Sequence, residues 1–246
     1  MRQSLRVRPT SPQRKQGWID PCLRCWLVFL FLLVACPAWA AEPLTVKAVE
    51  AAPPDDLAEP VRALFGKEAF TIAEKDGDEM LTLWFRTTIP VKASAEQIKN
   101  GLTYREIPEG EVIGAVKFAK TFVDYRKQEI AAGTYTLRFG VQPDVGDHMG
   151  TTPHPEFALL SPAAKDKDAE AIDMKSLIKL SSGATNGDHP GVMLLFPHTA
   201  KENGPKLADK DDGVKVLLIR RAVDADGTKT TLGFALTVAG YSKARK

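Results

Sequence analysis

The sequence 133–141, GTYTLRFGV, decides the fold class of this chain. Apolar side chains occupy alternate positions, Tyr135, Leu137 and Phe139, and threonine or arginine stands between them. Because successive side chains of a β-strand point to opposite faces of a sheet, this period of two predicts a half-buried strand. We expect the three apolar side chains to face the core and Thr136 to face solvent, so that replacing Thr136 with alanine leaves stability nearly unchanged.

The same period of two recurs along the chain on both sides of this strand. Asp-Gly pairs at 76–77 and 226–227 separate neighbouring stretches, and Asp-Gly between alternating runs indicates a hairpin. The pattern predicts an all-β fold with minor short helices, a β-sandwich with jelly-roll or Greek-key-like strand order. The alternating stretches begin at Leu44, Leu81, Val112, Val214 and Leu232, and continuous apolar runs lie at 157–160 and 192–196.

Helical signals are confined to three short segments. The first is 56–65, and the second starts at Ser94, with Gln97 in the capping-box position. The third is 173–182, with Asp173 as the capping residue. The charged stretch 165–173 is expected to form an exposed loop.

Residues 1–40 have the three parts of a secretory signal peptide with a long basic leader. Six basic residues and one acidic residue precede an apolar run, 26–35, whose ten residues are too few to span a bilayer. Small residues follow at Ala38 and Ala40, which fits the A-x-A cleavage rule. We expect residues 41–246 to form a single β-sandwich domain with an acidic and proline-rich segment at 50–60.

The cysteines suggest an alternative for the leader. Leu33-Val34-Ala35-Cys36 resembles the lipobox of bacterial lipoproteins, in which the cysteine is lipidated and anchors the chain. The alternative localisation is therefore lipid-anchored at the envelope through Cys36, and we expect a membrane contact only in that case. All three cysteines lie within residues 1–40, so the rest of the chain has no disulfide.

The charge balance excludes one class of partner. Residues 41–246 hold 27 basic and 30 acidic residues, a formal charge of −3, so we expect no nucleic-acid partner. The chain has no nucleophile elbow, phosphate-binding loop or dinucleotide fingerprint. We therefore expect a protein that is not an enzyme.

Four histidines lie within 51 residues of one another and suggest a metal site. Imidazole and carboxylate are ligands of zinc, and imidazole also suits copper. If the loops converge, the ligands are His148, His154 and His189, with Asp147 and Asp188 beside them. The alternative is that these are ordinary loop histidines and that the protein has no cofactor.

Trp84 and Arg86 suggest a second candidate, a ligand surface. Both fall on the polar face of the stretch 81–88, where an exposed tryptophan beside arginine would suit a glycan. The alternative is that Trp84 seals the edge of the core, because large aromatic side chains supply much of core burial.

Within 129–141, EIAAGTYTLRFGV, the residues Ala132, Gly133, Tyr135 and Leu137 form an AGxYxL pattern. The pattern resembles a strand of a bacterial domain-of-unknown-function family whose members are exported and β-rich. The resemblance implies export and β-structure, and it implies no activity.

Together these features predict an exported, periplasmic or extracellular, non-catalytic β-sandwich protein. We expect a binding or envelope-associated module whose partner is a small molecule, a glycan or an envelope component. The alternative is an exported protein that binds zinc or copper through its histidine loops.

Overall fold

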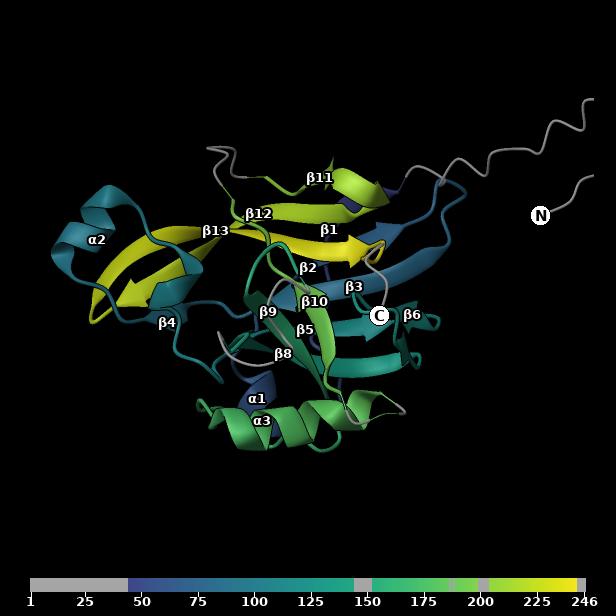
Figure 1. The fold of residues 1–246 in the computed structure, drawn as a ribbon, viewed down its shortest axis with the longest axis horizontal. Coiled ribbons are helices and arrows are strands. Elements are labelled where there is room, and N and C mark those ends of the chain that lie inside the picture. The colour runs from purple at the N-terminus through teal and green to yellow at the C-terminus, as the bar shows by residue number, and fades with distance from the viewer. Residues whose placement is uncertain (1–43, 144–151, 186, 188, 199–203, 243–246) are drawn as a thin grey trace, which may run out of the picture. The chain divides into compact units, whose positions relative to one another are not determined.

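Strands dominate the part of the chain that the structure describes (Figure 1). All of the described residues belong to one compact unit. The structure is a computed structural model, and it describes residues 44–143, 152–185, 187, 189–198 and 204–242.

Seven antiparallel strands form the larger sheet, and their order in the sheet follows their order in the chain. An order that follows the chain is that of a meander. The predicted all-β class is therefore confirmed, while the described strands do not have the jelly-roll or Greek-key order that we expected. From one edge to the other, the strands are β1 (Thr45–Glu50), β2 (Glu68–Ala73), β3 (Glu79–Phe85), β5 (Val112–Phe118), β8 (Gly133–Val141), β9 (Glu156–Pro162) and β10 (Gly191–Leu194).

The second sheet comprises four strands and meets the first at β10. An isolated bridge joins Leu195, just after β10, to Leu236 in the second sheet. The predicted Asp226-Gly227 hairpin is confirmed, since both residues have positive φ angles, 49° and 91°. The strands are β11 (Lys206–Asp209), β12 (Lys215–Ala225) and β13 (Thr228–Ala239), with β4 (Ile89–Val91) parallel to β12.

The helices are short, as expected. Ser94 and Gln97 form the predicted capping box, and Asp173 accepts a hydrogen bond from the Ser176 amide. The first helix is shorter than expected, because its N-cap residue, Ala58, has no side chain that could cap it. The remaining elements are α1 (Glu59–Arg62), α2 (Ala95–Asn100), α3 (Met174–Ser181), the 3-10 turns η1 (Tyr104–Glu106), η2 (Ser182–Ala184) and η3 (Asp211–Gly213), and the hairpin of β6 (Phe122–Val123) with β7 (Glu129–Ile130).

The two sheets share one hydrophobic core. Tyr135, Leu137 and Phe139 of β8 all belong to it, together with Ile219 of β12 and Phe234 of β13. The prediction that these three side chains of β8 face the core is confirmed.

Two helices pack on the opposite face of the larger sheet. Val61 of α1 packs with Trp84 of β3, and Leu177 of α3 packs with Leu159 of β9. Figure 1 shows α1 and α3 on one side of the larger sheet, with β11 to β13 on the other side. We call the side with α1 and α3 the outer face.

Candidate functional site

The polar side chains of β8 lie on the outer face, and they are buried. Thr136 and Arg138 are both 0% exposed, and Thr134 is 8% exposed. The expectation that Thr136 faces solvent is wrong, because the stretch that follows β9 folds over this face. Ala163 begins that stretch and donates a backbone hydrogen bond to Thr134. We call residues 163–173 the covering segment.

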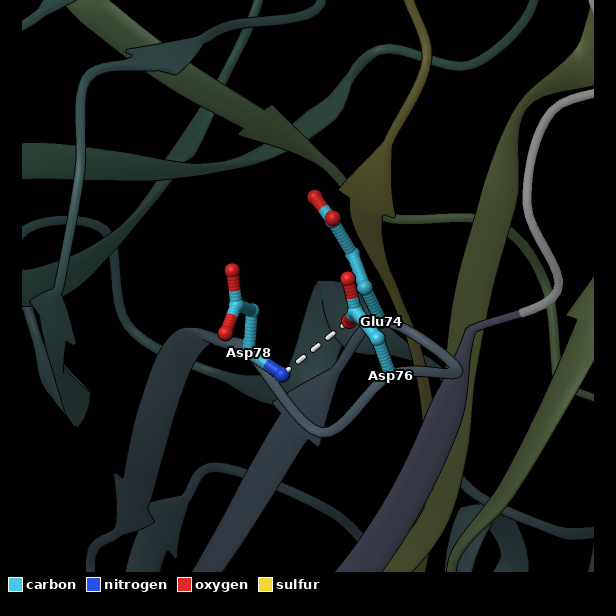
Figure 2. Close-up of side chains that lie close together, drawn as sticks. All are labelled: Glu74, Asp76 and Asp78. Atoms are coloured by element: carbon cyan, nitrogen blue, oxygen red, sulfur yellow. Dashed lines mark hydrogen bonds between the residues drawn. The ribbon is translucent and has the colours of Figure 1, made fainter.

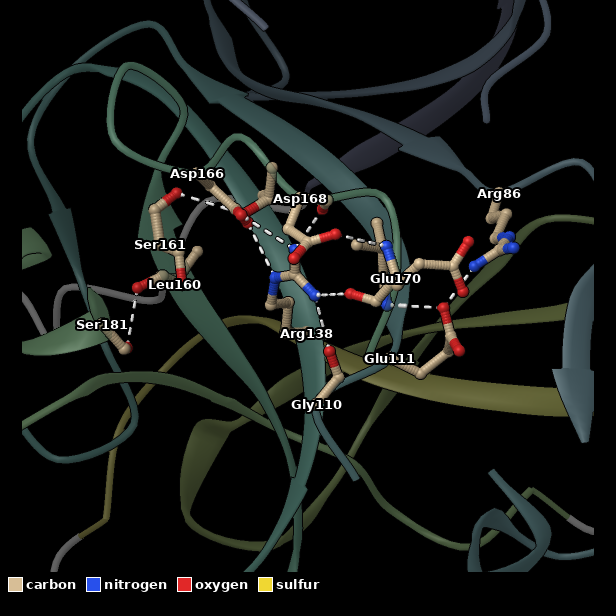
Figure 3. A network of polar contacts seen from close by, with 12 residues as sticks. Arg86, Gly110, Glu111, Arg138, Leu160, Ser161, Asp166, Asp168, Glu170 and Ser181 are labelled. Atoms are coloured by element: carbon tan, nitrogen blue, oxygen red, sulfur yellow. Dashed lines mark hydrogen bonds and ion pairs between the residues drawn. The ribbon is translucent and has the colours of Figure 1, made fainter. Parts of the chain in front are cut away.

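Arg138 is the largest fully buried side chain, and it ties the covering segment to the sheet (Figure 3). Its Nε and Nη2 donate to the two carboxylate oxygens of Asp166, each at 2.8 Å. Its Nη1 donates to the carbonyls of Gly110 and Glu170, and Nη2 also donates to the carbonyl of Asp168. All five N–H groups of the guanidinium therefore have acceptors.

The covering segment also closes against the loop before β5. Ile172 donates a backbone hydrogen bond to Gly110, and a Cβ on Gly110 would lie 1.8 Å from the Ile172 carbonyl oxygen. Only glycine allows the two backbones to come so close, and Gly110 also has a positive φ of 82°. A buried arginine with every donor paired and no room around it is a structural clamp rather than a binding group. We call Arg138 and its partners the clamp.

Glu111 and Arg86 extend the polar contacts toward β3. Glu111 is 5% exposed and accepts a hydrogen bond from Arg86. Burial raises the pKa of Glu111, and the positive charge of Arg86 acts against that change. Arg86 is thus committed to a partly buried ion pair.

The predicted ligand surface of Trp84 and Arg86 needs correction. Trp84 is 4% exposed, and its indole N–H donates to the carbonyl of Ala51 at 3.0 Å. It packs under α1 and seals the edge of the core, which is the alternative interpretation of Trp84 from the sequence. An exposed aromatic platform is therefore excluded at Trp84. Arg86 lines an open hollow of about 410 Å³ that also holds both basic and acidic side chains, among them Lys92 and Asp224.

A different cavity lies on the same outer face, between α3 and the strands β8 to β10. It encloses about 290 Å³, close to the lower end of the usual range for small-molecule sites, about 300–1,000 Å³. Most of its wall is apolar, and Ile178 of α3 is 40% exposed there. We call it the α3 pocket, and it is lined by Arg126, Gly140, Val141, Gln142, Pro143, Thr152, Phe157, Leu159, Met174, Ile178, His189, Pro190 and Val192.

Gly140 allows two side chains of this wall to lie close against the backbone of β8. It follows Arg138 on the same face of β8, and it pairs with Phe157 of β9. A Cβ at this position would lie 2.6 Å from Cδ1 of Leu159 and 3.3 Å from Cε of Met174. The missing side chain therefore keeps these two side chains at the floor of the pocket.

Arg126 reaches the pocket from the tip of the β6–β7 hairpin. The buried carboxylate of Asp124 accepts hydrogen bonds from the backbone amides of Arg126, Gln128 and Val192 and from the Gln128 side chain. Gln128 also donates to the carbonyl of Pro190. Burial raises the pKa of Asp124, and these four hydrogen bonds act in the opposite direction. The hairpin tip is thus fastened to β10, which forms one wall of the pocket.

The predicted metal ligands are only partly placed. Asp147, His148 and Asp188 lie outside the described residues. His189 lines the α3 pocket, whereas His154 packs edge-on against Phe196 with ring centroids 5.0 Å apart.

Burial lowers the pKa of His154 and so favours its neutral form. A zinc or copper site that uses these residues stays a prediction, and titration of the protein with either ion tests it.

The described residues contain one group of three acidic or metal-binding side chains close together (Figure 2). Glu74, Asp76 and Asp78 surround the β2–β3 turn, with ligand atoms within 4.8 Å of one another. Lys120 pairs with Glu74, and the Asp78 amide donates to Asp76. The group is mostly exposed and its contacts are those of a hairpin turn, so we assign it no ligand.

Arg126, Gly140 and Met174 were not predicted as site residues from the sequence. A glycine that ends the polar alternation of β8 is a usable signal, because a strand glycine often marks a close approach or a missing side chain. Arg138 offers a second signal, since a charge inside a strongly apolar strand calls for a buried partner.

Comparisons with known proteins found no relative of this chain. No family model matches the sequence, and neither a curated protein nor a solved structure matches the chain. Among the described residues, no helix is both long enough and apolar enough to cross a membrane.

Proposed function

We propose that this protein is a non-catalytic binding protein whose ligand occupies the α3 pocket. The observation that carries the proposal is the wall of that pocket, which is mainly apolar with a few polar groups at its rim. Ligand sites commonly combine an apolar cavity with a small number of placed polar groups. An exposed isoleucine at the mouth, Ile178, adds apolar surface that a ligand would cover.

The polar groups of the rim support recognition rather than chemistry. The Thr152 hydroxyl lies 3.0 Å from Oε1 of Gln142 and 2.9 Å from the carbonyl oxygen of His154, and its single O–H donates to one of the two at a time. Arg126 stands on a hairpin that Asp124 fastens to β10. Groups held in this way fix the orientation of a ligand at little entropic cost.

We further propose that the protein works outside the cytoplasm, in the periplasm or the extracellular space. The basic leader and the short apolar run within residues 1–40 support export. Lipidation at Cys36 is the alternative, and the intact mass of the exported protein distinguishes the two.

Titration of the purified protein with an apolar fluorescent dye tests the pocket. We expect saturable binding that Ile178→Glu weakens by about ten-fold or more, because a carboxylate on the apolar wall must lose water when the dye binds. Lys179→Glu is the matched control, since Lys179 is the next residue of α3 and is not part of the lining. Equal loss in both variants, or no saturable binding, would contradict the proposal.

A further inference from the structure

The α3 pocket has an unbalanced charge. Among the residues that the structure describes, its lining includes no aspartate or glutamate. Of the described lining residues, Arg126 is the one whose side chain has a permanent charge. We infer that the ligand of this pocket is an amphiphilic anion, a carboxylate on a single short apolar chain or ring, and that Arg126 binds its charged end. This inference rests on the proposed function and specifies its ligand class.

The described surroundings of Arg126 leave its charge available. Asp124 precedes it by two residues in the same hairpin, and the two carboxylate oxygens of Asp124 already accept four N–H groups. A carboxylate has about four lone-pair positions, so Asp124 has none left for the guanidinium. Among the described residues, no ion pair involves Arg126.

The position of Arg126 is also fixed before any ligand arrives. Lys127, the next residue, has a positive φ of 67°, which forms the tight tip of the hairpin. Gln128 then ties the hairpin to the Pro190 carbonyl, beside His189 in the pocket wall. A guanidinium presented in this way binds carboxylate in a planar, bidentate geometry.

The apolar wall restricts the rest of the ligand. Phe157, Leu159 and Val192 lie in adjacent strands on the outer face, and Met174 and Ile178 of α3 oppose them. A volume of about 290 Å³ suits one short chain or ring rather than a two-chain lipid. An inorganic anion would leave this wall uncovered, so affinity should grow with chain length by about four-fold for each buried methylene.

Calorimetric titration of the full protein with octanoate, hexanoate, acetate and octanol at pH 7.5 tests the inference. We expect octanoate to bind more tightly than hexanoate, acetate not to bind, and octanol to bind about ten-fold more weakly than octanoate. Arg126→Gln should reduce octanoate affinity by about ten-fold and leave octanol affinity unchanged. Retained octanol binding also shows that this variant is folded. Lys179→Gln removes the same charge outside the pocket and should change neither affinity.

The outcomes separate the two proposals. Equal affinity for octanoate and octanol in the wild-type protein, or an Arg126→Gln variant that binds octanoate unchanged, overturns the anionic ligand and leaves the pocket as the site. Acetate binding as tight as that of octanoate also overturns the inference, because it shows an anion site without an apolar component. Failure of every probe and of the apolar dye overturns the proposed function itself.

Discussion

Arg138 and Gly140 are two residues apart on the same face of β8, and their surroundings differ in what covers them. Arg138 is the largest fully buried side chain, with every donor paired. Gly140 has no side chain, and it lines a cavity of about 290 Å³. One short stretch of strand thus contains a sealed region and an open one.

The difference follows from what covers each position. The covering segment lies over Arg138 and brings Asp166, which neutralises the charge of the guanidinium. The helix α3 lies over Gly140 and contributes Met174 and Ile178, which line the cavity without filling it. The clamp thus seals the part of the outer face that adjoins the α3 pocket.

The largest expected effect comes from breaking the clamp. Arg138→Met should lower the free energy of unfolding by about 3–5 kcal/mol, because it leaves the carboxylate of Asp166 buried and without its charge partner. Urea denaturation measures this change. The double variant Arg138→Met with Asp166→Leu should recover much of the loss, since it removes both charges. A double variant less stable than Arg138→Met would contradict the account of the clamp.

The next effect concerns Thr136, whose hydroxyl donates to Asp166 from the same face. Thr136→Ala should lower the free energy of unfolding by about 1.5–3 kcal/mol, the usual contribution of a hydrogen bond to a charged group. Thr136→Ser keeps the hydroxyl and should lose less. If Thr136→Ala unfolds at the same urea concentration as the wild-type protein, this face of β8 is not sealed.

A smaller effect on stability is expected at Gly140. Gly140→Ala should change the free energy of unfolding by less than about 1 kcal/mol, because Leu159 and Met174 can move into the adjacent cavity. The same movement should weaken dye binding several-fold, which the fluorescence titration measures. A loss of stability comparable to that of Arg138→Met would mean that the region around Gly140 is as tightly packed as the clamp.

The smallest expected effect is the pH dependence of stability that comes from His154. Burial lowers the pKa of His154 in the folded protein, so the unfolded chain binds the proton more readily. The contribution of His154 to the free energy of unfolding is therefore fully present above the pKa of the unfolded chain, about 6.5, and is lost as the pH falls below that value. His154→Leu should make the melting temperature less dependent on pH between about 7 and 5. An unchanged pH dependence would show that His154 titrates alike in both states.

The inner face of the fold was predictable, and the outer face was not. Alternation at Tyr135, Leu137 and Phe139 identified core positions correctly, because burial against a second sheet selects apolar side chains at every second residue. The same alternation cannot distinguish a polar face in water from a polar face under a loop. The charged stretch 165–173 appeared exposed in the sequence, yet Asp166 is 2% exposed, because its charge is paired with Arg138.

The candidate site was less predictable than the fold. His189 was identified, but for metal chemistry rather than as part of an apolar wall. Arg126 and Met174 come from elements far apart in the sequence, and only the packing of α3 and the β6–β7 hairpin brings them to one cavity. Gly140 also lines the cavity, and its missing side chain lets Leu159 and Met174 lie close to β8, which an alternating pattern does not reveal.

Amide chemical-shift mapping of the protein during titration with octanol tests the central claim most directly, because a neutral probe does not depend on the charge of Arg126. The account predicts saturable shifts at Gly140, Met174 and Val192, with Arg138 and Asp166 unchanged. Shifts concentrated at Arg138 and Asp166, or absent from all three pocket residues at saturation, would contradict the division of this face into a sealed clamp and an open pocket.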